Sequence, residues 1–108
     1  MAARLRWRPL ARADLLDIYE AIGNRSPAAA ERLYDTIEAK ARLLVDHPRL
    51  GPRRPDLGPS ARVPIVGWYL LLYQTHPDTD EGPVRRVEIV RVVDGRRDLP
   101  RLFAPGAR

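Results

Sequence analysis

The sequence predicts an α+β domain with the element order β-α-α-β-β-β. Three observations predict it: arginines alternate with apolar residues near the start, two helical apolar stripes follow, and residues 62–93 are rich in β-branched and aromatic side chains. A helical hairpin packed on one face of a small, mainly antiparallel sheet accounts for all three patterns. Residues 1–108 are expected to form one domain, with the second face of the sheet partly open.

The first element is predicted as a strand over residues 3–8. Arg4, Arg6 and Arg8 alternate there with Leu5 and Trp7, which is the period of two that a half-buried strand shows.

Two helices are predicted next. Pro9 suits the first turn of a helix, and Gly23, through its freedom at positive φ, suits its C-terminal cap. Ser26 followed by Pro27 is a start signal for a second helix, which ends before Pro48. The apolar stripes of the two helices are Ala11, Leu15, Ile18 and Ile22, then Ala30, Leu33, Ile37, Ala41 and Leu44. The short connection predicts an antiparallel hairpin.

Residues 48–60 are rich in proline and glycine, which predicts a stiff surface connection without regular structure. Three strands are predicted after it, over residues 62–66, 69–75 and 84–93, with a tight turn at Gly67 and Trp68. In the last strand we expect Val87 and Ile89 on one face and Val90 and Val92 on the other. This strand is therefore predicted to lie centrally and to be covered on both sides.

The net charge is +5, and Lys40 is the only lysine among the 19 basic residues. Seven arginines stand against three acidic residues between Arg85 and Arg108, so the positive charge is concentrated at that end. Two explanations stay open. A GC-rich genome favours arginine codons, and an acidic partner favours the bidentate hydrogen bonds of guanidinium groups.

Several classes of chemistry are excluded by residue content. The chain has no cysteine, and His47 and His76 lack the spacing of metal ligands, so we expect neither a metal nor a cofactor. Ser26 and Ser60 lie in a predicted helix cap and a predicted loop, without an activating base. The longest apolar run is too short for a membrane helix, and the start of the chain lacks a signal-peptide core, which predicts a cytoplasmic protein.

One catalytic reading remains, which is metal-free cleavage of RNA on an arginine-lined sheet. Arginine can bind a phosphate and stabilise developing charge, but it stays protonated and cannot accept a proton. A general base would have to come from His47, His76, Glu88 or Asp94. The carboxylates of Asp14 and Asp17, three residues apart on the first helix, are expected to belong to its solvated face.

Five blocks taken in order resemble the ParE branch of the RelE/ParE toxin superfamily. The resemblance spans about residues 5–103 and is strong because all five blocks occur together. They are Trp7, Ala11, Asp14 and Leu15; the segment His47 to Gly51; Arg62, Gly67, Tyr69, Leu71 and Tyr73; Val87 to Val92; and Asp94 to Phe103.

The resemblance implies the toxin of a type II toxin–antitoxin system, which inhibits DNA gyrase by binding and is neutralised by a ParD-like antitoxin. It implies no cofactor and no sequence-specific contact with nucleic acid. The candidates for target contact are Arg62, Trp68, Arg91, Arg96, Arg97 and Arg101. The candidates for antitoxin contact are Leu16, Tyr19, Tyr34, Tyr69 and Tyr73. Leu99, Leu102 and Phe103 are expected to tie the tail back to the core.

Two alternatives to a gyrase inhibitor remain. The first is a ribosome-dependent mRNA endonuclease of the RelE type, whose site would use Arg62, Tyr73, Arg91 and Asp94. Asp94 stands where many relatives carry a histidine, which removes an imidazole from that turn and disfavours the nuclease. The second is a decayed toxin that only binds its antitoxin.

Overall fold

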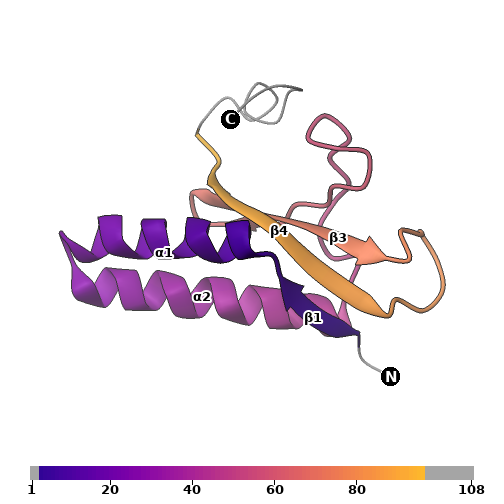
Figure 1. The fold of residues 1–108 in the computed structure, drawn as a ribbon, viewed down its shortest axis with the longest axis horizontal. Helices are drawn as coiled ribbons and strands as arrows, with labels where there is room; N and C mark the ends of the chain where they lie inside the picture. The colour runs from indigo at the N-terminus through magenta and orange to yellow at the C-terminus, as the bar shows by residue number, and fades with distance from the viewer. Residues whose placement is uncertain (1–2, 97–108) are drawn as a thin grey trace.

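The computed structural model describes residues 3–96 and confirms an α+β fold (Figure 1). The elements are β1 (Arg4–Trp7), α1 (Pro9–Gly23), α2 (Pro27–Asp46), β2 (Ile65–Val66), β3 (Tyr69–His76) and β4 (Arg86–Asp94). The strands form one sheet in the order β1-β4-β3-β2. β1 is parallel to β4, whereas the β4–β3 and β3–β2 pairs are antiparallel. The last strand is therefore central, as the sequence predicts.

The helical hairpin forms where the apolar stripes place it. Pro9 and Pro27 occupy the first turns of α1 and α2, and the Ser26 hydroxyl accepts a hydrogen bond from the Ala29 N–H at 3.2 Å. The expectation for Gly23 is wrong in one respect: Gly23 is the last residue of α1 and has no positive φ. The helix closes through backbone bonds from Asn24 instead, so the special freedom of glycine is not needed there.

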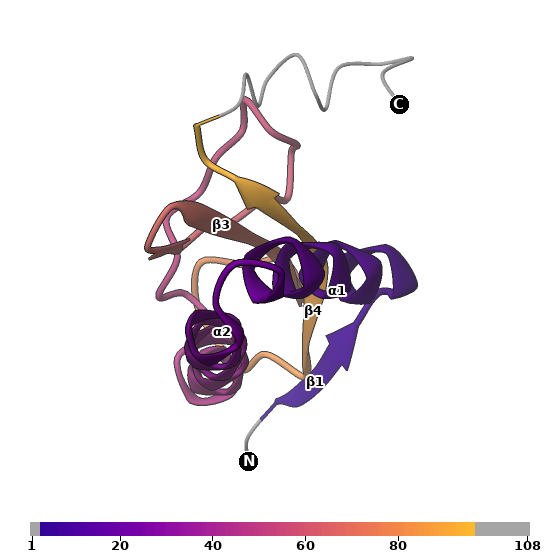
Figure 2. The same cartoon turned by 90° about the vertical axis from the view of Figure 1, so that its left-hand side faces the viewer.

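The main core lies between the hairpin and one face of the sheet (Figure 2). Leu15 from α1 and Ile37 from α2 are almost completely buried against Leu71, Val87 and Ile89 of the two long strands. Burying a side chain of this size contributes roughly 1.5–3 kcal/mol. Both helices therefore cover one face of the sheet, and neither helix covers the opposite face.

The predicted strand over residues 62–66 is shorter in the structure. Only Ile65 and Val66 form β2, while Arg62 makes isolated bridges to Arg53 and Tyr73. Pro64 explains the interruption, because it has no N–H to donate to a ladder. The tight turn at Gly67 and Trp68 is confirmed, and Gly67 adopts the positive φ of 59° that this turn requires.

Strand β4 contains an irregularity that changes which residues face the main core. Tyr73 pairs with Ile89 and Leu72 with Arg91, so Val90 is an extra residue on β4. The expectation that Val90 and Val92 share a face is therefore wrong. Val92 is buried in the main core, and Val90 packs with the second apolar cluster on the other side of the sheet.

The second face of the sheet is divided into two halves. Over one half the proline-rich segment forms a cover, with Leu57, Ala61 and Val63 packed on Leu70 and Leu72 of β3. The other half, over β1 and the start of β4, carries polar side chains. The expectation of a partly open face is met only on this polar half.

Candidate functional site

The predicted target-contact residues that lie on the surface gather where β2 turns into β3 and β4 ends. The exposed Trp68 side chain retains 67% of its accessible area, and Ile65 nearby retains 70%. The guanidinium of Arg96 lies over the indole of Trp68, 5.3 Å from the ring centroid, which is cation–π geometry. We name the set Ile65, Trp68 and Arg96 the tryptophan end.

The turn after β4 holds the tryptophan end in place. The Gly95 N–H donates to the Trp68 carbonyl at 2.7 Å, which ties the end of β4 to the β2–β3 turn. The Asp94 carboxylate accepts from the Arg96 N–H at 2.9 Å and from its guanidinium Nη2 at 2.6 Å. Asp94, a candidate proton acceptor by sequence, therefore orients Arg96. Arg97 and Arg101, together with Leu99, Leu102 and Phe103, lie outside the described residues.

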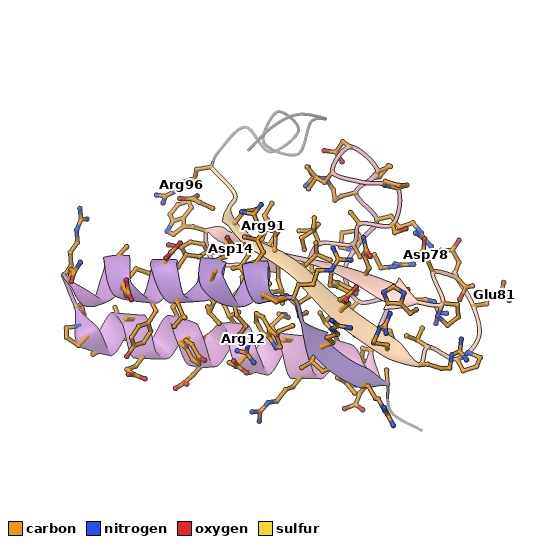
Figure 3. All side chains as sticks on the ribbon, in the orientation of Figure 1. Arg12, Asp14, Asp78, Glu81, Arg91 and Arg96 are labelled. Carbon is orange, nitrogen blue, oxygen red and sulfur yellow. The ribbon has the colours of Figure 1, made fainter. Side chains whose placement is uncertain are left out.

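Arg91 is half-buried and bound to α1. Its guanidinium donates to the two carboxylate oxygens of Asp14 at 2.7 and 3.1 Å, and the Val92 N–H donates to Asp14 at 3.0 Å (Figure 3). The expectation that Asp14 lies on the solvated face of its helix is therefore wrong. β1 ends at Trp7 and leaves the rest of that edge of β4 without a neighbouring strand. α1 runs beside this edge, and the Asp14 carboxylate accepts the hydrogen bond of the Val92 N–H there.

Arg62 and Tyr73 are buried, which sets them apart from the other candidates. The Arg62 side chain donates to the Gly51 carbonyl at 3.2 Å and contacts Asp80, and only 5% of the residue is exposed. The Tyr73 hydroxyl donates to the Pro48 carbonyl at 2.7 Å and accepts from the Gly51 N–H at 2.9 Å. Burial raises the pKa of Tyr73, against smaller opposing effects of Gly51 and Arg62. The Tyr73 hydroxyl therefore donates its proton to a hydrogen bond that stabilises the fold.

The predicted antitoxin-contact residues differ in accessibility. Leu16 on α1 is exposed at 53%, and Tyr19, one turn further, is half-buried. Tyr19 meets Tyr34 of α2 edge to face, with ring centroids 5.7 Å apart, and its hydroxyl bonds Glu31. Tyr34 and Tyr69 pack against the main core, and Tyr73 has no exposed area. Leu16 and the outer side of Tyr19 are thus the surface that this group offers.

Two polar clusters were missed by sequence reasoning. In the first, Arg49, Arg53 and Arg62 bind the acidic loop of residues 77–83 through Asp78, Asp80 and backbone carbonyls. In the second, the buried Glu88 carboxylate accepts from Arg8 at 3.0 Å and contacts His76 at 3.2 Å. His76 is the last residue of β3, which extends one residue beyond the strand predicted over 69–75. Strand register, which no sequence signal fixed, brings Arg8, His76 and Glu88 together.

Residues 3–96 contain neither a metal-binding cluster nor a membrane-spanning helix. No group of three histidine, aspartate or glutamate side chains is arranged to hold a metal ion. Neither helix of this described part is long and apolar enough to cross a membrane.

A helical hairpin on a mixed four-stranded sheet, with an arginine-bearing turn after the central strand, defines the class of small toxin-like α+β proteins that the five sequence blocks resemble. Residues 5–99 match the model of the family described as "ParE toxin of type II toxin-antitoxin system, parDE". Since this match covers most of the chain, the protein belongs to the ParE toxin family.

A solved structure supports the fold independently. It is described as "Chromosomal ParDE TA system from P. aeruginosa", and it aligns with a TM-score of 0.69 at 21% identity. The alignment covers 86% of this chain and 96% of that chain. The search of curated proteins found no significant match. The structural likeness therefore concerns the architecture.

Proposed function

We propose that this ParE-family chain inhibits DNA gyrase in the cytoplasm by binding to it, and that a ParD-like antitoxin neutralises it. The observation that carries the proposal is the tryptophan end. An exposed tryptophan with a guanidinium stacked on its ring, beside an exposed isoleucine, has the composition of a protein-binding hot spot.

The nuclease alternative receives less support from the arrangement of its four candidate residues. Arg62 and Tyr73 are buried in contacts with Gly51, so neither presents its polar atoms to a substrate. Arg91 is bound to Asp14, and Asp94 is bound to Arg96. A general base must reach the proton that it removes, and these groups are engaged in holding the fold.

The antitoxin contact is proposed for the outer face of the helical hairpin. Leu16 and Tyr19 lie three positions apart and share one face of α1. A partner helix that covers Leu16 would remove apolar area from water and rest on the Tyr19–Tyr34 contact. The ParDE description of the similar solved structure makes an antitoxin the natural partner to test.

The test of the target is an assay of gyrase supercoiling and gyrase-dependent DNA cleavage with the purified chain. Trp68→Ala is expected to weaken inhibition at least about tenfold, because truncating a central hot-spot residue costs on the order of 2 kcal/mol. Leu10→Ala is the matched control, since Leu10 is 55% exposed on α1 and belongs to neither proposed contact surface. Melting temperatures of both variants should stay close to that of the parent protein.

Other outcomes of the same experiment separate the alternatives. Unchanged gyrase activity combined with mRNA cleavage on translating ribosomes would replace the proposal by the nuclease. The absence of both activities, with retained binding to the product of the neighbouring antitoxin gene, would identify a decayed toxin.

Leu16→Glu should weaken co-purification with that antitoxin while leaving gyrase inhibition unaffected. A variant that co-purifies fully would remove Leu16 from the proposed antitoxin surface.

A further inference from the structure

The polar half of the second sheet face carries four arginines: Arg4 and Arg6 on β1, Arg8 directly after β1, and Arg86 on β4. The register places Arg4 opposite Arg86, and Arg86 opposite His76 of β3. The next row places Arg6 opposite Glu88, and Glu88 opposite Gln74. Arg8 follows at the end of β1. We name this set the arginine face: Arg4, Arg6, Arg8, Gln74, His76, Arg86 and Glu88.

The alternation of side chains proves that these residues point away from the helices. Leu5 and Trp7 of β1, and Val87 and Ile89 of β4, pack in the main core beneath the hairpin. Residues between them must point to the opposite side, because successive side chains of a strand alternate. The contact of Arg8 with both Glu88 and Gln74 spans three strands and confirms a shared face.

The arginine face keeps a strong positive charge after its internal pairing. Glu88 is its one acidic residue, and that carboxylate is covered, with 8% of its side chain exposed. Arg6 and Arg8 remain 61% and 42% exposed although both lie near Glu88. Among residues 3–96, no carboxylate lies within ion-pair distance of Arg4 or Arg86. The acidic loop beyond β3 is engaged elsewhere, since Asp78 and Asp80 bind Arg53 and Arg62.

The composition of the arginine face indicates what kind of partner it fits. A protein-binding surface is anchored by aromatic and aliphatic side chains, as at the tryptophan end, and the arginine face has none. Interfaces with nucleic acid are more polar and much more positively charged. Guanidinium groups bind phosphate oxygens in bidentate pairs. Arginines at every second residue of a strand stand about 6.6–6.8 Å apart in a row, which suits a run of phosphates.

We propose that the arginine face binds the phosphate backbone of a nucleic acid, without reading its sequence. Contacts to phosphates position a nucleic acid, whereas contacts to base edges specify its sequence. The amide oxygen of Gln74 accepts from Arg8, and the ring of His76 contacts Glu88, so these two side chains are engaged within the face and the arginines are the groups left to meet a ligand. This inference stands on the charge and register of β1, β3 and β4 and does not rest on gyrase as the target.

The test is the fluorescence anisotropy of a short labelled DNA duplex titrated with the purified full chain at several salt concentrations. Arg4→Gln/Arg86→Gln is expected to weaken binding at least about tenfold in low salt. The slope of log K against log salt should also become shallower by about 0.9 for each lost phosphate contact. Changing the duplex sequence should leave the affinity within about twofold.

The control is Arg25→Gln/Arg32→Gln, which removes the same charge from exposed positions of the helical hairpin. It should change the affinity by less than about threefold. Because Arg86 is half-buried, a second variant with two exposed positions, Arg4→Gln/Arg6→Gln, is measured in parallel, so that a folding defect in one variant cannot decide the result.

Three outcomes would overturn the proposal. One is the absence of binding in low salt. Another is an equal loss of affinity in the control, which would reduce the effect to net charge. The third is a poly-glutamate peptide that competes as well as DNA of matched charge and loses affinity in the same variants, which would assign the face to an acidic protein segment.

Discussion

The carboxylate of Asp14 fastens α1 to β4 through three hydrogen bonds, two from the Arg91 guanidinium and one from the Val92 N–H. Only 13% of the Asp14 side chain is exposed. Sequence periodicity placed this residue on a solvated face, because an amphipathic pattern gives no information about a strand edge that ends nearby. The contact gives a physical reason for aspartate three positions after Ala11 in the opening block.

Asp14→Ala is expected to destabilise the protein by about 2–3 kcal/mol. It leaves a buried backbone N–H without a partner and removes two charge-assisted hydrogen bonds. Asp17→Ala is the control, since Asp17 is exposed on the same helix and should change stability by less than about 0.5 kcal/mol. Urea unfolding at neutral pH measures both, and equal stability of the two variants would contradict a structural role for Asp14.

At the scale of elements, the helices were predicted closely and the strands less so. Both helices follow from apolar periodicity and proline signals, which act within one turn. The extra residue in β4 was not predictable, because β-branched residues occur on both faces of that strand and no residue type marks the irregularity. The proline-rich segment packs over β3 through contacts between residues far apart in the sequence. Local sequence patterns do not predict such contacts.

Gly51 allows the proline-rich segment to approach the sheet closely at Tyr73. A Cβ at this position would lie 2.8 Å from a Pro64 ring carbon and 2.8 Å from the Tyr73 ring. Gly51→Ala is therefore expected to destabilise the protein by about 1–3 kcal/mol through overpacking. Gly23→Ala is the matched control, because its Cβ would make an ordinary 3.7 Å contact with Ala30. Thermal unfolding that leaves both variants equally stable would contradict this close approach.

At the scale of the whole molecule, the sequence pattern predicted the architecture but not the placement of every candidate side chain. Trp68 and Arg96 were candidates by sequence and do lie together on the surface. Arg62 and Tyr73 were candidates as well, yet burial places them among the groups that join the proline-rich segment to the sheet. The arginine face was missed, because its members come from three strands and meet only through their register.

Glu88 links the stability of the whole molecule to pH. Burial acts to raise the pKa of Glu88, but hydrogen bonds from Arg8 and His76 outweigh it and hold the pKa below its ordinary value. A lowered pKa means that the group contributes stability above its unfolded pKa near 4.5 and loses this contribution as pH falls through the folded value. Wild type should therefore lose more stability than Glu88→Gln below about pH 4.5.

Urea unfolding of both proteins between neutral pH and about pH 3 measures this difference directly. Other carboxylates with lowered pKa values, such as Asp78, contribute the same background slope to each protein. Parallel pH profiles of wild type and Glu88→Gln would show that the Glu88 contacts add no net stability to the charged form.

The parallel pairing of β1 with β4 determines when the chain forms the tryptophan end and the arginine face during synthesis. Arg4 pairs with Arg86, so β1 leaves the ribosome about eighty residues before β4, the strand with which it pairs. The helical hairpin can form early from local contacts, whereas the long sheet pairings wait for β4. The hydrogen bond from the Gly95 N–H to the Trp68 carbonyl forms only after β4 has been made. The arginine face also requires β4, because β4 lies between β1 and β3 and pairs with both. A nascent chain therefore presents neither surface until its central strand has emerged.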